Sequence, residues 1–205
     1  MVVGPVVEIL VGDCYWLRHL APELQTNPCR VLDVGAHIGS FSVALARAVP
    51  SAEVIAYEPS GKRAAYLRQN IAVNCLSDRV SVVRAAIAGH AGQQALCDYQ
   101  LLAGPVGPHI EVVDVVAFED VLKSIEGRVD LMKMDCEGSE YEMVGSASTA
   151  LLSKVHRLVL EYHPAPPGRL AGLLARLTQA GLVERWRHDT LPGQLGVMYL
   201  ARVRG

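Results

Sequence analysis

Short apolar runs alternate with stretches of helical spacing along most of this chain. The runs have the length of buried strands and cover residues 31–34, 54–57, 80–83, 111–116, 129–134, 155–162, 182–187 and 196–203. Between them, apolar residues recur every three or four positions over 41–49, 61–71, 118–125, 140–152 and 170–177, the spacing of amphipathic helices. This alternation predicts an α/β fold with a mostly parallel sheet and helices on both faces. Ligands of such sheets bind beyond the carboxyl ends of the strands.

Two segments depart from the alternation. Residues 1–29 are expected to form a helical or irregular extension, and residues 89–108, rich in glycine and proline, a hairpin or an irregular excursion. The chain shows no internal repeat and no interdomain linker, so we expect one domain over 1–205 with its core in 30–205. The apolar start is interrupted by glycine, proline and glutamate, which is typical of neither a signal peptide nor a membrane span.

Composition narrows the class of protein. With 205 residues, 51% hydrophobic and 20% charged, the chain can bury a sizeable core. A net charge of −2 argues against a general nucleic-acid surface, which is usually basic. The five cysteines stand in no CxxC pair, so neither a zinc site nor a disulfide framework is predicted, and a reducing, cytoplasmic location is expected.

The segment VLDVGAHIGSFS (31–42) carries a glycine turn directly after a strand. Gly35 lets the backbone leave the strand sharply, and Gly39 lets the next helix begin close to the sheet. The spacing is G-x-x-x-G rather than the G-x-G-x-x-G of dinucleotide folds, so no pyrophosphate nest is expected. Asp33 can reach a ligand ammonium, and Glu58 can accept hydrogen bonds from ribose hydroxyls. We therefore predict a nucleoside cofactor without phosphate, S-adenosylmethionine (SAM), over the alternative that these residues only shape a turn.

Three blocks of sequence resemble the FkbM family of class I methyltransferases, over roughly residues 30 to 165. They are VLDVGAHIGSFS, YEPSGKRAAYLRQNIAVN (57–74) and DLMKMDCEGSEYEMVGSA (130–147), of which the last is the most specific. VLEYHP (159–164) matches the strand that usually follows. The family commonly has Asn where this chain has His37, and Arg84-Ala85-Ala86 lacks the acidic residue that many methyltransferases place near the adenine.

The resemblance implies a Rossmann-like, seven-stranded class I methyltransferase sheet whose last strand is antiparallel. It also implies SAM-dependent methylation, mostly of hydroxyl oxygens on sugars and natural-product scaffolds, with S-adenosylhomocysteine as the product. The residues expected to hold SAM are Asp33, Gly35, His37, Gly39, Glu58, Pro59, Ala86 and Asp135.

A second group of polar residues follows two later strands. Lys133, Asp135 and Glu137 alternate at the end of one strand, and Glu161 and His163 at the end of the next, so each set projects from one side. Methyl transfer to an alcohol needs alignment of donor and acceptor and a base that removes the hydroxyl proton. These five residues are the predicted catalytic centre, with His163 as the base, oriented by Asp135 or Glu161.

Structural roles for the same residues stay open. Asp135 can hold the cofactor or a turn amide, Lys133 can be an ion-pair partner, and His163 can hydrogen-bond a loop. Glu137 and Glu140 can cap the following helix, because carboxylates favour that end of the helix dipole. Trp16 and Trp186 are expected to pack in the core or at a rim rather than to line a substrate pocket.

A divalent metal is the main chemical alternative. Asp135 and Glu161 occupy places comparable to the ligands of catechol-type O-methyltransferases, where Mg²⁺ would lower the pKa of the alcohol. The chain lacks the motif of that family, so no metal ligand is predicted.

The predicted function is SAM-dependent O-methylation of a hydroxyl on a small molecule. The alternatives are methylation of nitrogen, of a carboxyl group or of a macromolecule, and a catalytically inert SAM-binding domain. An NAD-dependent oxidoreductase is disfavoured by the missing third glycine. We expect no nucleic-acid or membrane partner, and the sequence leaves a homodimer open.

Overall fold

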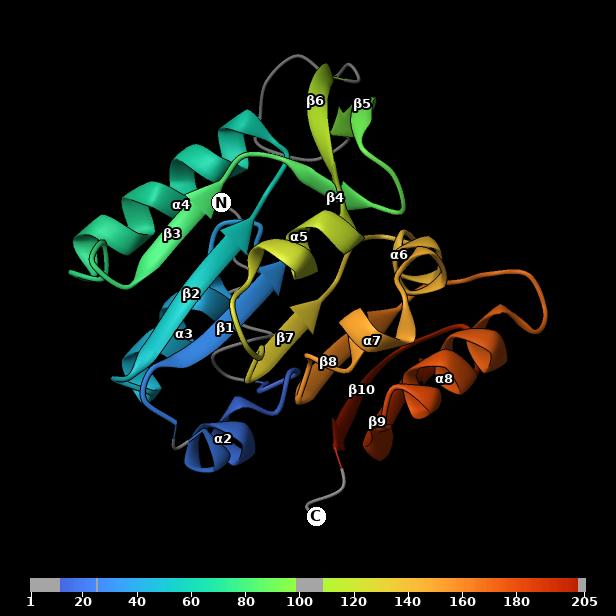
Figure 1. The fold of residues 1–205 in the computed structure, drawn as a ribbon. Coiled ribbons are helices and arrows are strands. Elements are labelled where there is room, and N and C mark those ends of the chain that lie inside the picture. The colour runs from blue at the N-terminus through green and yellow to red at the C-terminus, as the bar shows by residue number, and fades with distance from the viewer. Residues whose placement is uncertain (1–11, 25, 99–108, 203–205) are drawn as a thin grey trace.

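A seven-stranded sheet runs through the molecule (Figure 1) in a computed structural model that describes residues 12–24, 26–98 and 109–202. Its strands, in the order β3-β2-β1-β7-β8-β10-β9, are β1 (Cys29–Val34), β2 (Ala52–Tyr57), β3 (Val80–Val83), β7 (Leu131–Met134), β8 (Arg157–Tyr162), β9 (Leu182–Leu191) and β10 (Leu195–Arg202). The neighbours among β3, β2, β1, β7 and β8 are parallel, whereas β10 is antiparallel to both β8 and β9. The predicted class I methyltransferase topology is therefore confirmed.

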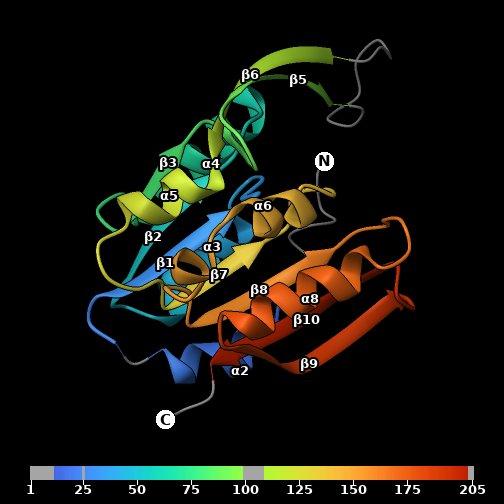
Figure 2. The same ribbon diagram turned by 45° about the vertical axis from the view of Figure 1, so that its right-hand side comes forward.

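Helices cover both faces of this sheet, as Figures 1 and 2 show. One face packs against α2 (Leu17–Leu20), α3 (Ser40–Ala48) and α4 (Gly61–Val73), the other against α5 (Phe118–Ser124), α6 (Glu140–Ser146), α7 (Thr149–Leu152) and α8 (Arg169–Gln179). In β1, Val31 belongs to the core of the first face and Leu32 to that of the second. The apolar runs are continuous because parallel strands between two helical layers are buried on both sides.

A smaller sheet adjoins the main one. It consists of β4 (Ala86–Ala88), β6 (His109–Ala117) and β5 (Gly92–Asp98), with β6 parallel to β4 and antiparallel to β5. In Figure 2, β5 and β6 extend away from the seven-stranded sheet. The predicted excursion over 89–108 thus includes β5, while residues 99–108 lie outside the described part of the chain.

Most predicted elements differ from the structure by one or two residues at an end, and two differ more. The single helix expected over 140–152 is two helices, because Ser148 begins a new one: its side chain accepts the N–H of Leu151, as an N-cap does. The strand expected over 182–187 continues to Leu191 and pairs with β10 along this length. The predicted cap at Ser60 is confirmed, since its side chain accepts the N–H of Arg63.

The described part of the N-terminal segment packs into the core on the α3 side. The apolar cluster that contains Val31 also contains Leu17 and Leu20 of α2. It also contains the buried Leu24, which directly follows the 3₁₀-helix η1 (Ala21–Glu23). Residues 12–16, which directly precede α2, are therefore held in one place relative to the strand ends.

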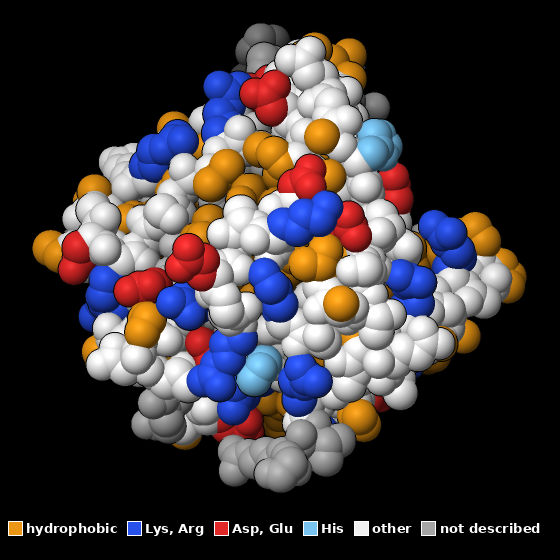
Figure 3. Space-filling view, in the orientation of Figure 1, with side chains coloured by type: hydrophobic (Ala, Val, Ile, Leu, Met, Phe, Trp, Pro, Cys, Tyr) orange, Lys and Arg blue, Asp and Glu red, His pale blue; other side chains and the backbone are white. Residues whose placement is uncertain are grey.

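The outer face formed by α5, α7 and α8 carries positive and negative side chains interspersed (Figure 3). Among the described residues, no helix combines the length and apolarity needed to cross a bilayer.

Candidate active site

A cavity of about 1040 Å³ opens at the carboxyl ends of β1, β2, β7 and β8. Residues 12–16 and strands β9 and β10 complete its wall. The predicted site residues that line it are Gly35, His37, Glu58, Pro59, Ala86, Lys133, Asp135, Glu137 and Glu161. Asp33, Gly39 and His163 do not line it. The sheet therefore brings most of both predicted groups to one cavity.

A second cavity, of about 400 Å³, lies between β1, β2 and β3 and contains none of the predicted site residues. Its charged lining includes Arg30, Glu53, Asp78 and Arg79. The Arg79 guanidinium already donates to the carbonyls of Ala46 and Ala52. We therefore assign the chemistry to the larger cavity.

The glycines of the turn are required by neighbouring protein atoms. Gly35 has φ +75°, and a Cβ there would lie 1.8 Å from the carbonyl oxygen of Asp135. Gly39 has φ +86°, and a Cβ would lie 2.2 Å from Leu67 of α4. Both backbone conformations favour glycine. Gly35 therefore lets β1 and β7 end side by side, whereas Gly39 lets α3 begin against α4.

Glu58 is held rigidly at the end of β2. The backbone N–H of His37 donates to its Oε2 and that of Ser60 to its Oε1, both at 2.9 Å. Burial raises the pKa of Glu58 to about 7, although these two hydrogen bonds and nearby cations oppose the rise. Each oxygen retains lone-pair capacity toward the cavity, so the carboxylate can accept hydrogen bonds from a pair of hydroxyl groups.

The sequence predicted that Asp33 contacts the ligand, but Asp33 does not line the cavity. Its carboxylate is fully buried, accepts the Ser42 hydroxyl at 2.6 Å and lies 3.6 Å from Lys133 Nζ. Lys133 in turn donates to the Gly35 carbonyl at 2.6 Å and lies 3.5 Å from Asp135 Oδ2. A buried carboxylate needs such partners. Asp33 and Lys133 therefore tie the turn to the end of β7.

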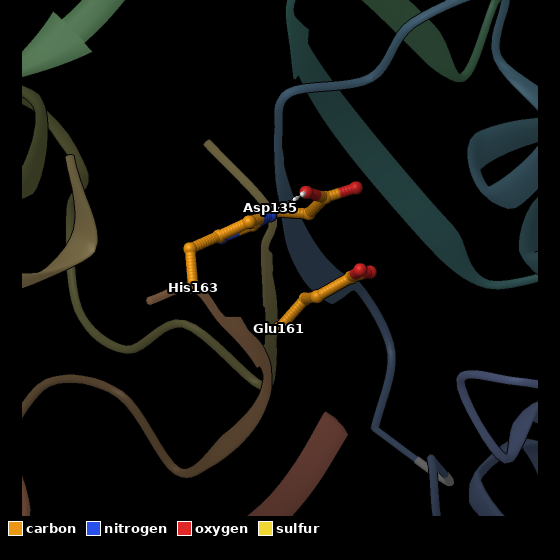
Figure 4. A group of neighbouring side chains, drawn as sticks. All are labelled: Asp135, Glu161 and His163. Carbon is orange, nitrogen blue, oxygen red and sulfur yellow. Dashed lines mark ion pairs between the residues drawn. The ribbon is translucent and has the colours of Figure 1, made fainter. Parts of the chain in front are cut away.

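Asp135, Glu161 and His163 lie together at the ends of β7 and β8 (Figure 4). The Nε2 atom of His163 is 3.9 Å from Asp135 Oδ1. Burial alone would raise the pKa of Asp135, but the Lys133 charge and a tyrosine hydrogen bond outweigh it, so this pKa is lowered. Burial and the Asp135 charge raise the pKa of Glu161. The two neighbouring carboxyl groups therefore differ in acidity: Asp135 is the stronger acid and Glu161 the weaker one.

Glu140, not Asp135 or Glu161, orients His163, which corrects the predicted arrangement. Glu140 Oε1 is 3.3 Å from His163 Nδ1 and accepts the His163 backbone N–H at 2.8 Å. Its Oε2 accepts the N–H of Gly138 at 2.9 Å, so the fully buried carboxylate joins the two strand-end loops. Burial lowers the pKa of His163, but the hydrogen bond to Glu140 and the charges of Glu140, Asp135 and Glu137 together outweigh this effect, so the pKa is raised.

Glu137 differs from the expected helix cap. Its residue has φ +54°, its side chain is 88% exposed, and its Oε2 lies 3.5 Å from His163 Nε2. It therefore extends the acidic surroundings of His163 toward solvent. Neither Glu137 nor Glu140 is the N-cap of α6, which is Ser139.

The N-terminal segment contributes residues that the sequence did not reveal. The Tyr15 hydroxyl lies 2.8 Å from Asp135 Oδ2 and 2.9 Å from Glu161 Oε2. Trp16 stacks on Trp186 of β9 with ring centroids 5.1 Å apart. Both residues line the cavity as well as packing against the core, which corrects the expectation that they only pack. No local pattern pointed to Tyr15, because its partners are 120 and 146 residues away.

Whether this group fits a divalent metal can be judged from its atoms. Asp135, Glu161 and His163 each offer one ligand atom, and these atoms lie within 4.8 Å of one another. However, the facing oxygens of the two carboxyl groups already contact the Tyr15 hydroxyl, and the Lys133 ammonium lies 3.5 Å from Asp135. A divalent ion would have to displace the Tyr15 hydroxyl and lie near the positive charge of Lys133. The two carboxyl groups therefore fit a hydroxyl group as their partner better than a divalent ion.

The strand order, the glycine turn after β1 and the polar strand ends define a class I methyltransferase fold. The ribosomal protein L11 methylase of Lactobacillus delbrueckii subsp. bulgaricus shares it at 13% identity and a TM-score of 0.56, over 94% of this chain and 79% of that one. Magnesium protoporphyrin IX methyltransferase from Synechocystis PCC 6803, solved with bound SAM, shares it at 15% identity and a TM-score of 0.53, over 96% and 82%. The fold alone therefore does not identify an acceptor.

The sequence profile of the methyltransferase FkbM domain matches residues 33–186. This chain belongs to the FkbM methyltransferase family. Methyltransferase sdnD of Sordaria araneosa is 25% identical over 233 residues, which include 95% of this chain and 88% of that protein. The family inferred from the three sequence blocks is thereby confirmed, and the protein is a methyltransferase.

Proposed function

We propose that this enzyme transfers the methyl group of SAM to a hydroxyl oxygen of a small, uncharged acceptor. The observation that carries the proposal is the position of Asp135 and Glu161 in the same cavity as Glu58 and the glycine turn. One cavity thus offers a fixed carboxylate for a ribose and, beside it, a separate acidic group for an acceptor.

The residues present fit SAM. Glu58 keeps acceptor capacity for the two ribose hydroxyls, and Ala85, Ala86 and Ile87 give the adjoining wall a mostly apolar surface for an adenine. The backbone of Gly35 and His37 borders the place for the methionine part. When bound, SAM supplies an activated methyl group on a positively charged sulfur.

The charges of the acceptor side favour a neutral acceptor. Asp135, Glu161 and the exposed Glu137 surround the far end of the cavity, and Lys133 is already engaged by two carboxylates. A carboxylate or phosphate acceptor would meet the like charge of Asp135 there, which Lys133 balances only in part. Carboxyl methylation is therefore disfavoured, whereas a hydroxyl can donate a hydrogen bond to Asp135.

The same residues can remove the hydroxyl proton. Asp135 lines the cavity and accepts the hydrogen of the acceptor hydroxyl, and His163 lies on its other side with Nδ1 held by Glu140. The 3.9 Å separation of Asp135 Oδ1 and His163 Nε2 exceeds a hydrogen bond, so proton passage requires closer approach or one bridging water. Apo sites commonly tighten in this way when substrate binds.

Calorimetry and a matched acceptor set test the proposal. We expect SAM and S-adenosylhomocysteine to bind and NAD to give no heat. With methyl-labelled SAM, we expect label on the hydroxyls of a neutral sugar or polyol and none on the carboxyl group of the corresponding acid. No heat with SAM contradicts the cofactor; label on an amine or carboxylate contradicts the acceptor class; and SAM binding without any turnover supports an inert domain instead.

The raised pKa of Glu58 predicts a pH dependence of SAM binding. The ionised carboxylate is the better acceptor for ribose hydroxyls, and with a pKa of about 7 it becomes protonated as the pH falls from 8 to 6. We expect the Kd for SAM to rise by about 10-fold over this interval, as for binding to the ionised form alone. Glu58→Gln should raise the Kd about 10- to 100-fold at pH 8 and remove this dependence. A pH dependence that persists in Glu58→Gln would assign it to another group, such as the SAM amine.

A further inference from the structure

Tyr15 joins the two carboxyl groups of the proposed acceptor site from a distant part of the sequence. Only 5% of this residue is exposed, its ring meets Phe41 edge-on at 5.8 Å, and Lys133 Nζ lies 5.3 Å from the ring centroid. Packing therefore fixes the hydroxyl between Asp135 and Glu161, at 2.8 and 2.9 Å.

The single hydrogen of the Tyr15 hydroxyl limits the protonation states of Asp135 and Glu161. A phenol carries one hydrogen, so it can donate to only one of two carboxylates. If both groups were ionised, the second contact would place two sets of lone pairs against each other in a buried site. The contacts balance when one carboxyl group is protonated and donates to the tyrosine oxygen, while the tyrosine donates to the other.

Lys133 decides which group keeps the proton. Among the described ion pairs, its ammonium lies within 4 Å of Asp33 and Asp135 but is not paired with Glu161. Asp135 is therefore the anion and Glu161 the acid, in the order Glu161, Tyr15, Asp135, Lys133. The directions of the two pKa shifts, lowered at Asp135 and raised at Glu161, agree with this order.

We propose that Tyr15 is a positioning residue that holds Asp135 and Glu161 as a pair with one negative charge and one shared chain of hydrogen bonds. The pair then offers the acceptor hydroxyl a single, fixed anion at Asp135, and Glu161 stays neutral at working pH. This inference rests on the proposed function for its catalytic consequence, but the protonation state itself can be observed without any substrate.

Infrared spectroscopy tests the protonation state directly. At pH 7 we expect the wild-type spectrum minus the Glu161→Gln spectrum to show the carbonyl band of a buried protonated carboxyl group. The contribution of Glu58, whose pKa is about 7, cancels in this difference. Tyr15→Phe keeps the ring but removes the hydroxyl, so the band should shift or disappear. No such band in the difference, or a band that Tyr15→Phe leaves unchanged, overturns the proposal. Because no acceptor is present, failure of the proposed function would not affect this result.

Kinetics separates positioning from a merely structural role. We expect Tyr15→Phe to lower kcat about 10- to 100-fold, to shift the acidic limb of the pH–rate profile and to leave the Kd for SAM within about twofold. Tyr66→Phe is the matched control, because Tyr66 is 40% exposed on α4 and outside the cavity; it should change nothing. A lower thermal stability with unchanged kcat and an unchanged pH profile would mean that Tyr15 only packs.

Discussion

Gly35→Ala should weaken SAM binding strongly and destabilise the fold. The new Cβ would lie 1.8 Å from the Asp135 carbonyl oxygen, a backbone atom at the end of the buried strand β7, which cannot rotate away. The left-handed conformation at φ +75° adds about 1–2 kcal/mol for a residue with a side chain. With about 1–3 kcal/mol for overpacking, the free energy of unfolding should fall by about 2–5 kcal/mol.

The weaker SAM binding follows from the movement of the β7 end that the new Cβ forces. Moving the end of β7 away from β1 separates the turn from Lys133, which holds it through the Gly35 carbonyl and the Asp33 carboxylate and also pairs with Asp135. We expect about a 100-fold rise in the Kd for SAM, because the loss of a hydrogen bond to a charged group costs about 1.5–3 kcal/mol. Calorimetry and thermal unfolding measure the two effects.

Gly172→Ala provides the control for glycine replacement. Gly172 lies within α8, where a Cβ would meet no atom within 4 Å. An alanine in a helix interior should stabilise the protein by about 0.5–1 kcal/mol and leave SAM binding unchanged. Normal SAM affinity in Gly35→Ala would contradict the assigned contact between the turn and β7.

His163→Gln should reduce kcat by about 10²–10⁴-fold, the usual contribution of a general base. The Kd for SAM should stay within about twofold, since His163 does not line the cavity. In the wild type, kcat should rise as His163 loses its proton. The midpoint should lie above the ordinary histidine pKa of about 6.5, because the bond to Glu140 and the surrounding carboxylate charges together outweigh burial. The variant should lack this limb of the profile.

The matched control is another histidine paired with a glutamate. His90 Nδ1 lies 2.9 Å from Glu142 Oε1, but the His90 side chain is 80% exposed and outside the cavity. His90→Gln should therefore leave kcat and its pH profile unchanged. If His163→Gln retains wild-type turnover, Asp135 itself is the base, and Asp135→Asn should then show the full loss.

Sequence patterns predicted the elements of the fold because the signals are local. The apolar run at 31–34, the turn of Gly35 and Gly39 and the cap at Ser60 each depend on residues within one or two turns of chain. Helical spacing continues across the break between α6 and α7, so the sequence predicts one helix over 140–152, whereas the Ser148 cap that separates them is a small competing signal. The sequence likewise predicted which polar residues lie at the strand ends, because a polar residue directly after a buried strand is easily identified.

Partners within the site were not readable in this way. Asp33 was expected to face a ligand, yet it lies beneath the turn beside Ser42 and Lys133. Glu140 was one of two candidate caps, but the approach of the β7 and β8 loops makes it the partner of His163. Whether a carboxylate faces a cavity or a buried cation depends on which strands are neighbours, and local periodicity contains no information on that.

The chain's own residue order therefore accounts for most of its strands and helices, for the glycine turn and for the family. The tertiary structure alone decided that β1 lies beside β7 and that Tyr15 reaches Asp135 and Glu161 across 120 and 146 residues. The physical reason is the difference in range between the interactions that determine each feature. Helix and strand periodicity, capping and turn conformation act over a few residues, whereas hydrogen-bond partners and pKa values in a buried site depend on distances of a few ångströms between atoms that only the packed sheet brings together.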